Sequence, residues 1–79
     1  MTARIVVYSR DGCHLCDELV AELDALLAPR GVTWQLQDVD ADPATRRRFG
    51  LKVPVVTLDG GLVCHGRLDS AELLERLAR

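Results

Sequence analysis

The sequence predicts an α/β domain with a four-stranded mixed sheet and helices on both faces, in the order β-α-β-α-β-β-α. Two observations predict it. An apolar β-type run opens the chain and leads into a long amphipathic segment. A turn sequence, Asp59-Gly60-Gly61, later joins two further β-type runs. With 79 residues there is room for one hydrophobic core, so residues 1–79 are expected to form a single domain.

The first half of the chain begins with a strand, a long helix and a second strand. Residues 4–8 form a near-continuous apolar run, which is typical of a central strand buried on both faces. A helix is expected from about residue 13 to residue 28, because leucines recur there at helical spacing opposite acidic residues. Residues 32–39 alternate as a second strand, and a right-handed crossover would place it parallel to the first.

A short helix and a hairpin are expected next. Asp42 fits the N-cap of the helix, Pro43 its first position and Gly50 its end. Residues 52–58 then form a third strand, and residues 62–65 a fourth strand antiparallel to it.

A final helix is expected over residues 69–78. Its leucines Leu73, Leu74 and Leu77 face inward, and Asp69 or Ser70 caps its start.

Composition and charge narrow the classes of function. The net charge of −2 and the sequence pI of about 5.5 argue against nucleic acid or an anionic membrane as partner. The sequence shows no signal segment and no membrane-spanning stretch, so a cytoplasmic protein is expected, with a monomer as the default. Three cysteines do not fit the disulfide framework of a small secreted domain.

The chemistry of the chain is expected at two cysteines separated by two residues, Cys13 and Cys16, which follow the first strand and open the first helix. At a helix start, unpaired backbone N–H groups and the positive end of the helix dipole stabilise a thiolate. Cys13 is therefore predicted to be the nucleophile. Cys16, one turn deeper, is placed to attack a mixed disulfide formed on Cys13. This setting indicates thiol–disulfide exchange without a metal or an organic cofactor.

The chain resembles proteins of the thioredoxin fold in three features. These are the order of its elements, the Cys-x-x-Cys pair after the first strand, and Val53-Pro54 in the third strand. The short chain is similar to the glutaredoxin branch, and most similar to small bacterial glutaredoxin-like proteins that carry Gly-Cys-His-Leu-Cys-Asp. The resemblance implies a thiol–disulfide oxidoreductase with Cys13 as nucleophile and Cys16 as resolving thiol. It implies a disulfide-containing protein or glutathione as partner, glutathione as a candidate cosubstrate, and a thioredoxin-type reductase as an alternative electron donor.

The same resemblance implies roles for residues around the cysteine pair. Pro54 is expected to follow a cis peptide bond, and the backbone of Val53 to hydrogen-bond an incoming peptide. Arg10 corresponds to a basic residue near the glutathione thiol. Gly66 and Asp69 correspond to positions near the γ-glutamyl end of glutathione.

Two departures from the glutaredoxin pattern concern the substrate. His14-Leu15 replaces the usual Pro-Tyr inside the motif. Leu15 is expected to form an exposed apolar lip that contacts substrate, and His14 either tunes the thiolate or is a solvent-exposed filler. Cys64-His65-Gly66 replaces the usual Gly-Gly before the last helix, and side chains there are expected to crowd the γ-glutamyl site. Weak glutathione binding is therefore expected.

Alternative interpretations stay open. Cys64 is either a third redox thiol or a small buried filler. Arg46-Arg47-Arg48 is either a solvated helix face or a docking site for an acidic partner or a glutathione carboxylate. A non-catalytic module would keep the fold and hold an extended peptide in the groove at Pro54. A metal or iron–sulfur binder is the third class, but structural zinc sites usually need four ligands and no second cysteine pair exists.

Overall fold

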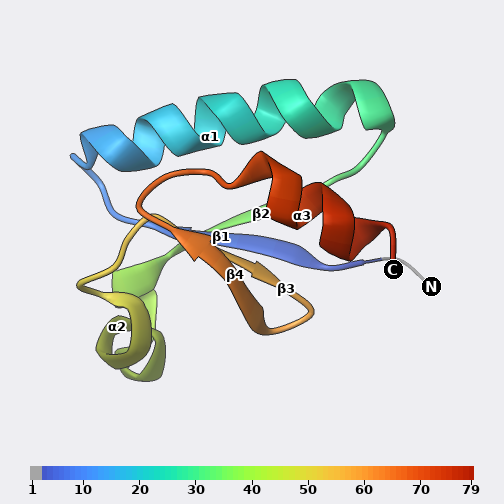
Figure 1. The fold of residues 1–79 in the computed structure, drawn as a ribbon. Coiled ribbons are helices and arrows are strands. Elements are labelled where there is room, and N and C mark those ends of the chain that lie inside the picture. Colours follow the sequence, from blue (N-terminus) through green and yellow to red (C-terminus); the bar gives the residue numbers. More distant parts are fainter. Residues whose placement is uncertain (1–2) are drawn as a thin grey trace.

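The computed structural model describes residues 3–79, which form a four-stranded sheet in the order β2-β1-β3-β4. Helices α1 and α3 lie on one face of the sheet and α2 lies against the other (Figure 1). This arrangement confirms the predicted α/β class and the predicted order of elements. The elements are β1 Ile5–Ser9, α1 His14–Leu27, β2 Gln35–Asp38, α2 Pro43–Phe49, β3 Val55–Leu58, β4 Gly61–His65 and α3 Ser70–Leu77.

The pairing of the strands decides which loops meet. β1 is parallel to β2, with Val7 opposite Leu36, and antiparallel to β3, with Val7 opposite Val56. β3 is antiparallel to β4, where Val56 lies opposite Cys64. The ends of β1 and β2 and the start of β3 therefore share one edge of the sheet. The loops that follow β1 and β2 and the segment that precedes β3 come together at this edge.

The larger of two hydrophobic clusters, called here the α1-side core, fills the space between the sheet and helices α1 and α3. Alternate residues of β1 and β3 point to this face, and α1 meets them with leucines at helical spacing. The buried members of the α1-side core are Ile5, Val7, Leu19, Leu23, Leu27, Val56 and Leu73.

No helix among residues 3–79 is both long and apolar enough to cross a membrane.

The smaller cluster, called here the α2-side core, lies on the opposite face of the sheet. Its buried members are Val39, Phe49 and Val55, and the half-buried Tyr8 and Val53 pack against them. The rings of Tyr8 and Phe49 lie 5.1 Å apart between centroids, in a tilted arrangement. This cluster lies at the end of the sheet where β1 stops and β3 starts, so it supports the loops that meet there.

Helix α2 begins as predicted. The carboxylate of Asp42 accepts a hydrogen bond from the Ala44 N–H at 2.8 Å, and Pro43 occupies the first turn. The hairpin turn also forms as predicted, because Asp59 and Gly60 both have positive φ, at 51° and 87°, as a tight two-residue turn requires.

Two strands are shorter than the sequence pattern predicted. The second strand was expected over residues 32–39 but β2 begins at Gln35, because Val32 and Trp34 pack against the α1-side core without joining the ladder. Leu36 alternates as an inward residue, yet it is 57% exposed because β2 is an edge strand. The third strand was expected over residues 52–58, and β3 begins only at Val55.

Candidate active site

Cys13 lies at the N-cap of α1 rather than inside its first turn. Its backbone is extended, with φ −95° and ψ 107°, and its Sγ accepts a hydrogen bond from the Cys16 backbone N–H at 3.2 Å. Gly12, at φ 76°, provides the left-handed turn that brings the chain from β1 to this cap. The sulfur is thus held at the positive end of the helix by a donated N–H group, and its residue is half-exposed.

Cys16 lies one turn further along the same helix and is only 2% exposed. Burial raises the pKa of its thiol to about 11, and a hydrogen bond to Cys13 adds to the shift. At neutral pH this thiol is protonated. The two cysteines therefore differ in access to solvent, and only Cys13 can be reached directly by a disulfide from outside.

Arg10 ties the loop before Cys13 to two other parts of the chain. Its Nε and Nη2 bind the two carboxylate oxygens of Asp40 at 2.8 and 3.0 Å, and its Nη1 donates to the Gly50 carbonyl oxygen at 2.9 Å. The guanidinium lowers the pKa of the Asp40 carboxyl, and the carboxylate raises the pKa of Arg10. The resemblance implied a contact with glutathione or the thiolate, whereas all three nitrogens of Arg10 face protein acceptors.

The segment formed by residues 50–54, called here the proline segment, lies at the same end of the molecule as the start of α1 (Figure 1). The Val53–Pro54 peptide bond is cis, and the Pro54 carbonyl accepts a hydrogen bond from the Gly66 N–H at 2.8 Å. Within residues 3–79, no hydrogen bond uses the backbone N–H or C=O of Val53. Leu51 is fully exposed. The segment thus offers a free backbone N–H and C=O at Val53 and an exposed apolar side chain at Leu51, at the end of the molecule that carries the start of α1.

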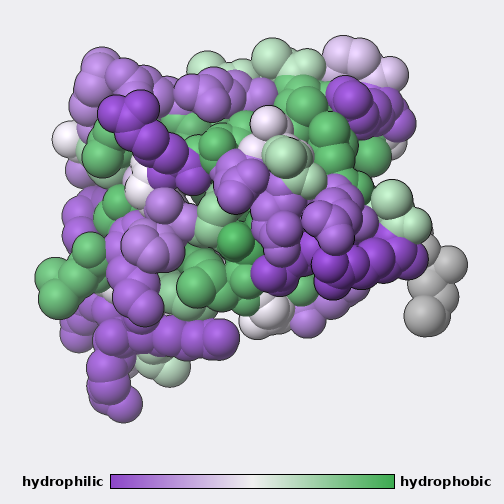
Figure 2. Space-filling view, in the orientation of Figure 1, coloured by the Kyte–Doolittle hydropathy of each residue, from purple (hydrophilic) through white to green (hydrophobic). Residues whose placement is uncertain are grey.

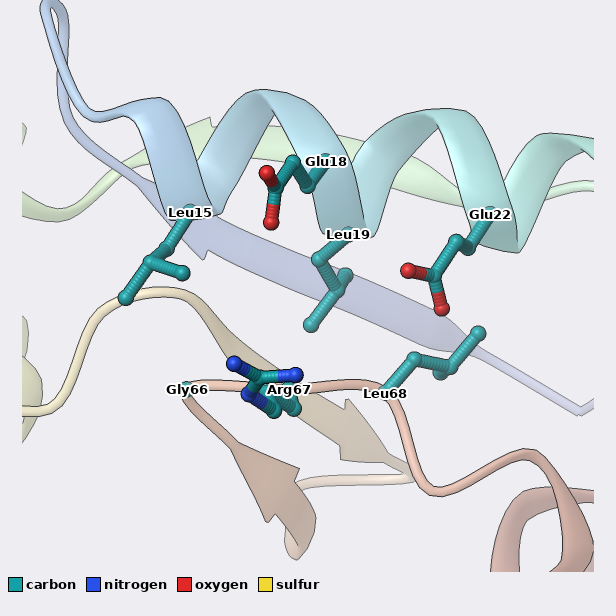
Figure 3. Close-up of a pocket in the computed structure, with 7 residues that line it drawn as sticks. All are labelled: Leu15, Glu18, Leu19, Glu22, Gly66, Arg67 and Leu68. Carbon is teal, nitrogen blue, oxygen red and sulfur yellow. The ribbon is translucent and has the colours of Figure 1, made fainter.

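A small cleft of about 130 Å³ opens between α1 and the link from β4 to α3. Figure 3 shows Leu15 and Leu19 pointing from α1 toward the Gly66–Leu68 link, with Glu18 and Glu22 above the same cleft. Leu15 is half-exposed, in agreement with an apolar lip next to the cysteine pair.

His14 and Asp69 both have partners within the protein. The His14 ring is 86% exposed, and its Nε2 lies 3.0 Å from Glu18 Oε1. The carboxylate of Asp69 caps α3 by accepting the Glu72 N–H at 3.1 Å, which confirms the predicted cap.

Cys64 and His65 differ in their surroundings. Cys64 is half-buried against the α1-side core, and its Sγ accepts the Asp69 N–H at 3.5 Å. Burial raises the pKa of this thiol, so it stays protonated at neutral pH. His65 is exposed at the end of β4.

The structure gathers Arg10, Cys13, Leu15 and Cys16 on one loop and helix start. It adds three residues that the sequence analysis had not assigned to the site, namely Asp40, Gly50 and Leu51. Across residues 3–79, no three His, Cys, Asp or Glu side chains are grouped so that they could hold a metal ion.

Comparisons with known proteins show which family and which structures this chain is similar to. A model of the glutaredoxin-like domain family (DUF836) matches residues 4–78. An uncharacterized protein of Mycobacterium tuberculosis is 30% identical over an alignment of 81 positions, which covers 96% of this chain and 84% of the relative. A Nitrosomonas europaea protein solved by NMR superposes with a TM-score of 0.84 at 29% identity, covering 96% of this chain and 92% of that one. Thioredoxin from Fasciola hepatica matches with a TM-score of 0.61 at 19% identity, covering 99% and 80%, so the fold is thioredoxin-like.

Proposed function

Because the chain belongs to the glutaredoxin-like domain family (DUF836), we propose that it is a thiol–disulfide oxidoreductase in which Cys13 attacks and Cys16 resolves. One observation carries the proposal. A half-exposed sulfur at a helix N-cap stands one turn from a thiol that is 2% exposed. This is the asymmetry that a two-cysteine exchange reaction needs, because substrate must reach one sulfur and must not reach the other.

The reaction has two exchange steps. The Cys13 thiolate attacks one sulfur of a substrate disulfide, a mixed disulfide forms, and the other substrate sulfur leaves as a thiolate. Cys16 then attacks Cys13 Sγ, its proton passes to a departing substrate thiolate, and the second substrate thiol is released. In total, one substrate disulfide becomes two thiols and the Cys13–Cys16 dithiol becomes a disulfide. No metal or organic cofactor takes part in either step.

The substrate proposed is a disulfide-containing protein. An extended substrate chain can pair with the backbone of Val53, whose N–H and C=O have no partner within residues 3–79. Main-chain pairing of this kind gives affinity without restricting sequence. Leu15 on α1 and Leu51 on the proline segment add exposed apolar side chains at the same end of the molecule.

Glutathione is proposed to be a poor cosubstrate. Its carboxylates and its amine need free partners, but Arg10 is engaged by Asp40 and Gly50, and one carboxylate oxygen of Asp69 already accepts the Glu72 N–H. The Gly66 N–H is likewise taken by Pro54. A thioredoxin-type reductase is the alternative electron donor. Titrating the Cys13–Cys16 pair against glutathione and against a thioredoxin reductase system would identify the reductant, and rapid full reduction by glutathione would contradict this part of the proposal.

We also propose that the protein works as a monomer in the cytoplasm. All three cysteines are free, and a reducing compartment keeps such thiols available for exchange.

The test of the proposed function is a single turnover. The reduced protein is mixed with hydroxyethyl disulfide, a small neutral substrate, and the thiol released is measured. We expect one disulfide to be reduced for each protein molecule, with oxidation of Cys13 and Cys16 and with Cys64 still free. A second candidate is a non-catalytic peptide-binding module, which the free backbone of Val53 also favours. Such a module would bind peptide without releasing any thiol.

A further inference from the structure

A row of positively charged side chains lies on α2 and in the proline segment. Arg46 and Arg47 lie in the second half of α2, and Lys52 follows in the proline segment itself. All three are exposed, and within residues 3–79 none of them forms an ion pair. We call these residues, together with the fully exposed Leu51 between them, the basic ridge. Figure 2 shows a hydrophobic protrusion at the left edge, at the height of the proline segment, next to hydrophilic side chains that cover α2.

Acidic side chains predominate around the cysteine pair on the loop before α1 and on α1 itself. Asp11 precedes the motif, Asp17 follows it, and Glu18 and Glu22 continue along the exposed face of α1. Within residues 3–79, Glu18 alone among these four carboxylates forms an ion pair, with the ring of His14. Arg67 on the link from β4 to α3 lines the same cleft as Glu18 and Glu22 (Figure 3). A substrate that approaches Cys13 therefore passes between an acidic helix and a basic ridge.

Arg10 does not supply the cation for an anionic substrate. It is the arginine nearest to Cys13 in sequence, but its guanidinium is occupied by Asp40 and Gly50. The same contacts fix Gly50, where the proline segment begins, to the loop before Cys13. Through Gly50 the ridge is thus tied to the loop that precedes Cys13. Arg46 lies close enough to Asp40 to help lower the pKa of that carboxyl, but within residues 3–79 neither Arg47 nor Lys52 forms an ion pair.

We propose that the disulfide substrate is a protein segment with acidic residues on one side of its reactive cysteine, and that this side lies along the basic ridge. This inference rests on the proposed function. The net charge of the chain is −2, so its overall field does not attract an acidic partner. At physiological ionic strength charges act over about 8 Å, so the local ridge decides which charge is accepted and in which orientation. Acidic residues on the other side of the substrate cysteine would meet the acidic face of α1.

The experiment uses single turnovers of the reduced full chain with synthetic peptide disulfides. Each peptide carries one cysteine and is blocked at both ends, with two glutamates or two lysines placed either before or after the cysteine. In one of the two placements, the glutamate peptide should react about fivefold to tenfold faster than the lysine peptide with the same placement. A difference of this size is the effect of a few exposed ion pairs. The reversed placement should lose that advantage, and high salt should reduce it.

Two charge-reversal variants locate the effect. Arg47→Glu should lower the ratio of glutamate-peptide to lysine-peptide rates by severalfold. Arg30→Glu makes the same change in net charge at the far end of α1, where Arg30 Nη1 donates to the Leu26 carbonyl at 2.7 Å, and it should leave the ratio unchanged. If Arg47→Glu does not fold, Arg47→Gln combined with Lys52→Gln makes the same test.

The possible failures are distinct. Equal rates for glutamate and lysine peptides in both placements would overturn the proposal while the protein still reduces hydroxyethyl disulfide. A glutamate preference that survives Arg47→Glu and Lys52→Gln would show that the ridge does not cause it. If hydroxyethyl disulfide itself is not reduced, the proposed oxidoreductase function fails, and the substrate inference fails with it.

Discussion

The two sides of the candidate site pack against different hydrophobic clusters. The side that carries the sulfurs is the start of α1, whose buried face, including Leu19 and Leu23, belongs to the α1-side core. The other side is the proline segment, which has no regular secondary structure. It packs against the smaller α2-side core through Val53 and is tied to its surroundings by the hydrogen bonds of Gly50 and Pro54. Leu51 on this side is fully exposed, whereas Cys16 on the first side is buried.

This difference suggests a division of roles. The sulfurs proposed to react lie on the element with the deepest packing, where a helix end holds Cys13 Sγ in a fixed geometry. The groups proposed to recognise substrate lie on the segment with the lighter support, where side chains are exposed and the backbone has free hydrogen-bonding groups. Four predictions test whether reaction and recognition separate in this way.

The largest effect is expected from Cys13→Ser. The substitution removes the only half-exposed sulfur at the helix start, so the single-turnover reduction of hydroxyethyl disulfide should fall to the uncatalysed rate. Cys13 belongs to neither hydrophobic cluster, so the midpoint of urea unfolding should stay close to that of the reduced parent chain.

Alkylation provides a second check on the same residue. Near neutral pH, iodoacetamide should label Cys13 first, because Cys16 is buried and burial raises its pKa to about 11. Peptide mapping that finds Cys16 or Cys64 labelled first would contradict the assignment of the nucleophile.

The second prediction compares the two clusters directly. Leu23→Ala in the α1-side core should lower the free energy of unfolding by about 2–5 kcal/mol, because Leu23 is fully buried. Phe49→Leu in the α2-side core should cost only about 1 kcal/mol. The turnover rate of the folded fraction should nevertheless fall more in Phe49→Leu, since that residue supports the proline segment. The opposite order of rates would break the comparison.

The third prediction concerns the alkaline side of the stability curve. The Cys16 thiol stays protonated in the folded protein up to about pH 11, whereas in the unfolded chain it ionises near 9. Between these values the unfolded chain binds fewer protons, so the free energy of unfolding falls as pH rises, by about 3 kcal/mol in total. The contribution is fully present below about pH 9.

The control for this prediction is Cys16→Ala. Its urea unfolding should lack that alkaline decline, as should the oxidised parent chain, in which Cys16 has no proton to lose. A decline of equal size in the reduced parent chain and in Cys16→Ala would assign the effect to other groups.

The smallest effect is expected from Arg10→Ala, which cuts the link between the two sides. Both partners of the ion pair are solvent-exposed, so the unfolding midpoint should shift no more than in Arg30→Ala, the matched loss of an arginine that also donates to a backbone carbonyl. The single-turnover rate should fall by up to about tenfold, because the proline segment is no longer fixed relative to Cys13. Arg10→Lys keeps the charge but not the bidentate geometry, and should recover only part of the rate.

Much of the fold could be predicted because its signals are local. The caps at Asp42 and Asp69 and the turn at Asp59-Gly60 each depend on a few neighbouring residues, and each forms as expected. The start of the second strand could not be predicted, because Val32 and Trp34 alternate like strand residues but are drawn into the α1-side core. Alternation alone does not distinguish packing from pairing.

The cysteine pair was evident from its spacing, whereas the partners of Arg10 were not. Asp40 and Gly50 are 30 and 40 residues away along the chain, and no local pattern links them. One topological signal was available. Parallel strands end at the same edge, so the residues just after β1 and just after β2 must lie near each other. This rule predicts from the sequence that Arg10 and Asp40 lie near each other.

The contacts of Arg10 also have a consequence for chimeric proteins. A chimera that takes the loop after β1 from a relative without an arginine at this position would leave the Asp40 carboxylate and the Gly50 carbonyl without their shared donor. A chimera that takes the loop after β2 as well would exchange both members of the ion pair together. The two loops are separated by a whole helix in sequence, yet they are one transferable unit, and positions 10 and 40 are expected to change together among relatives.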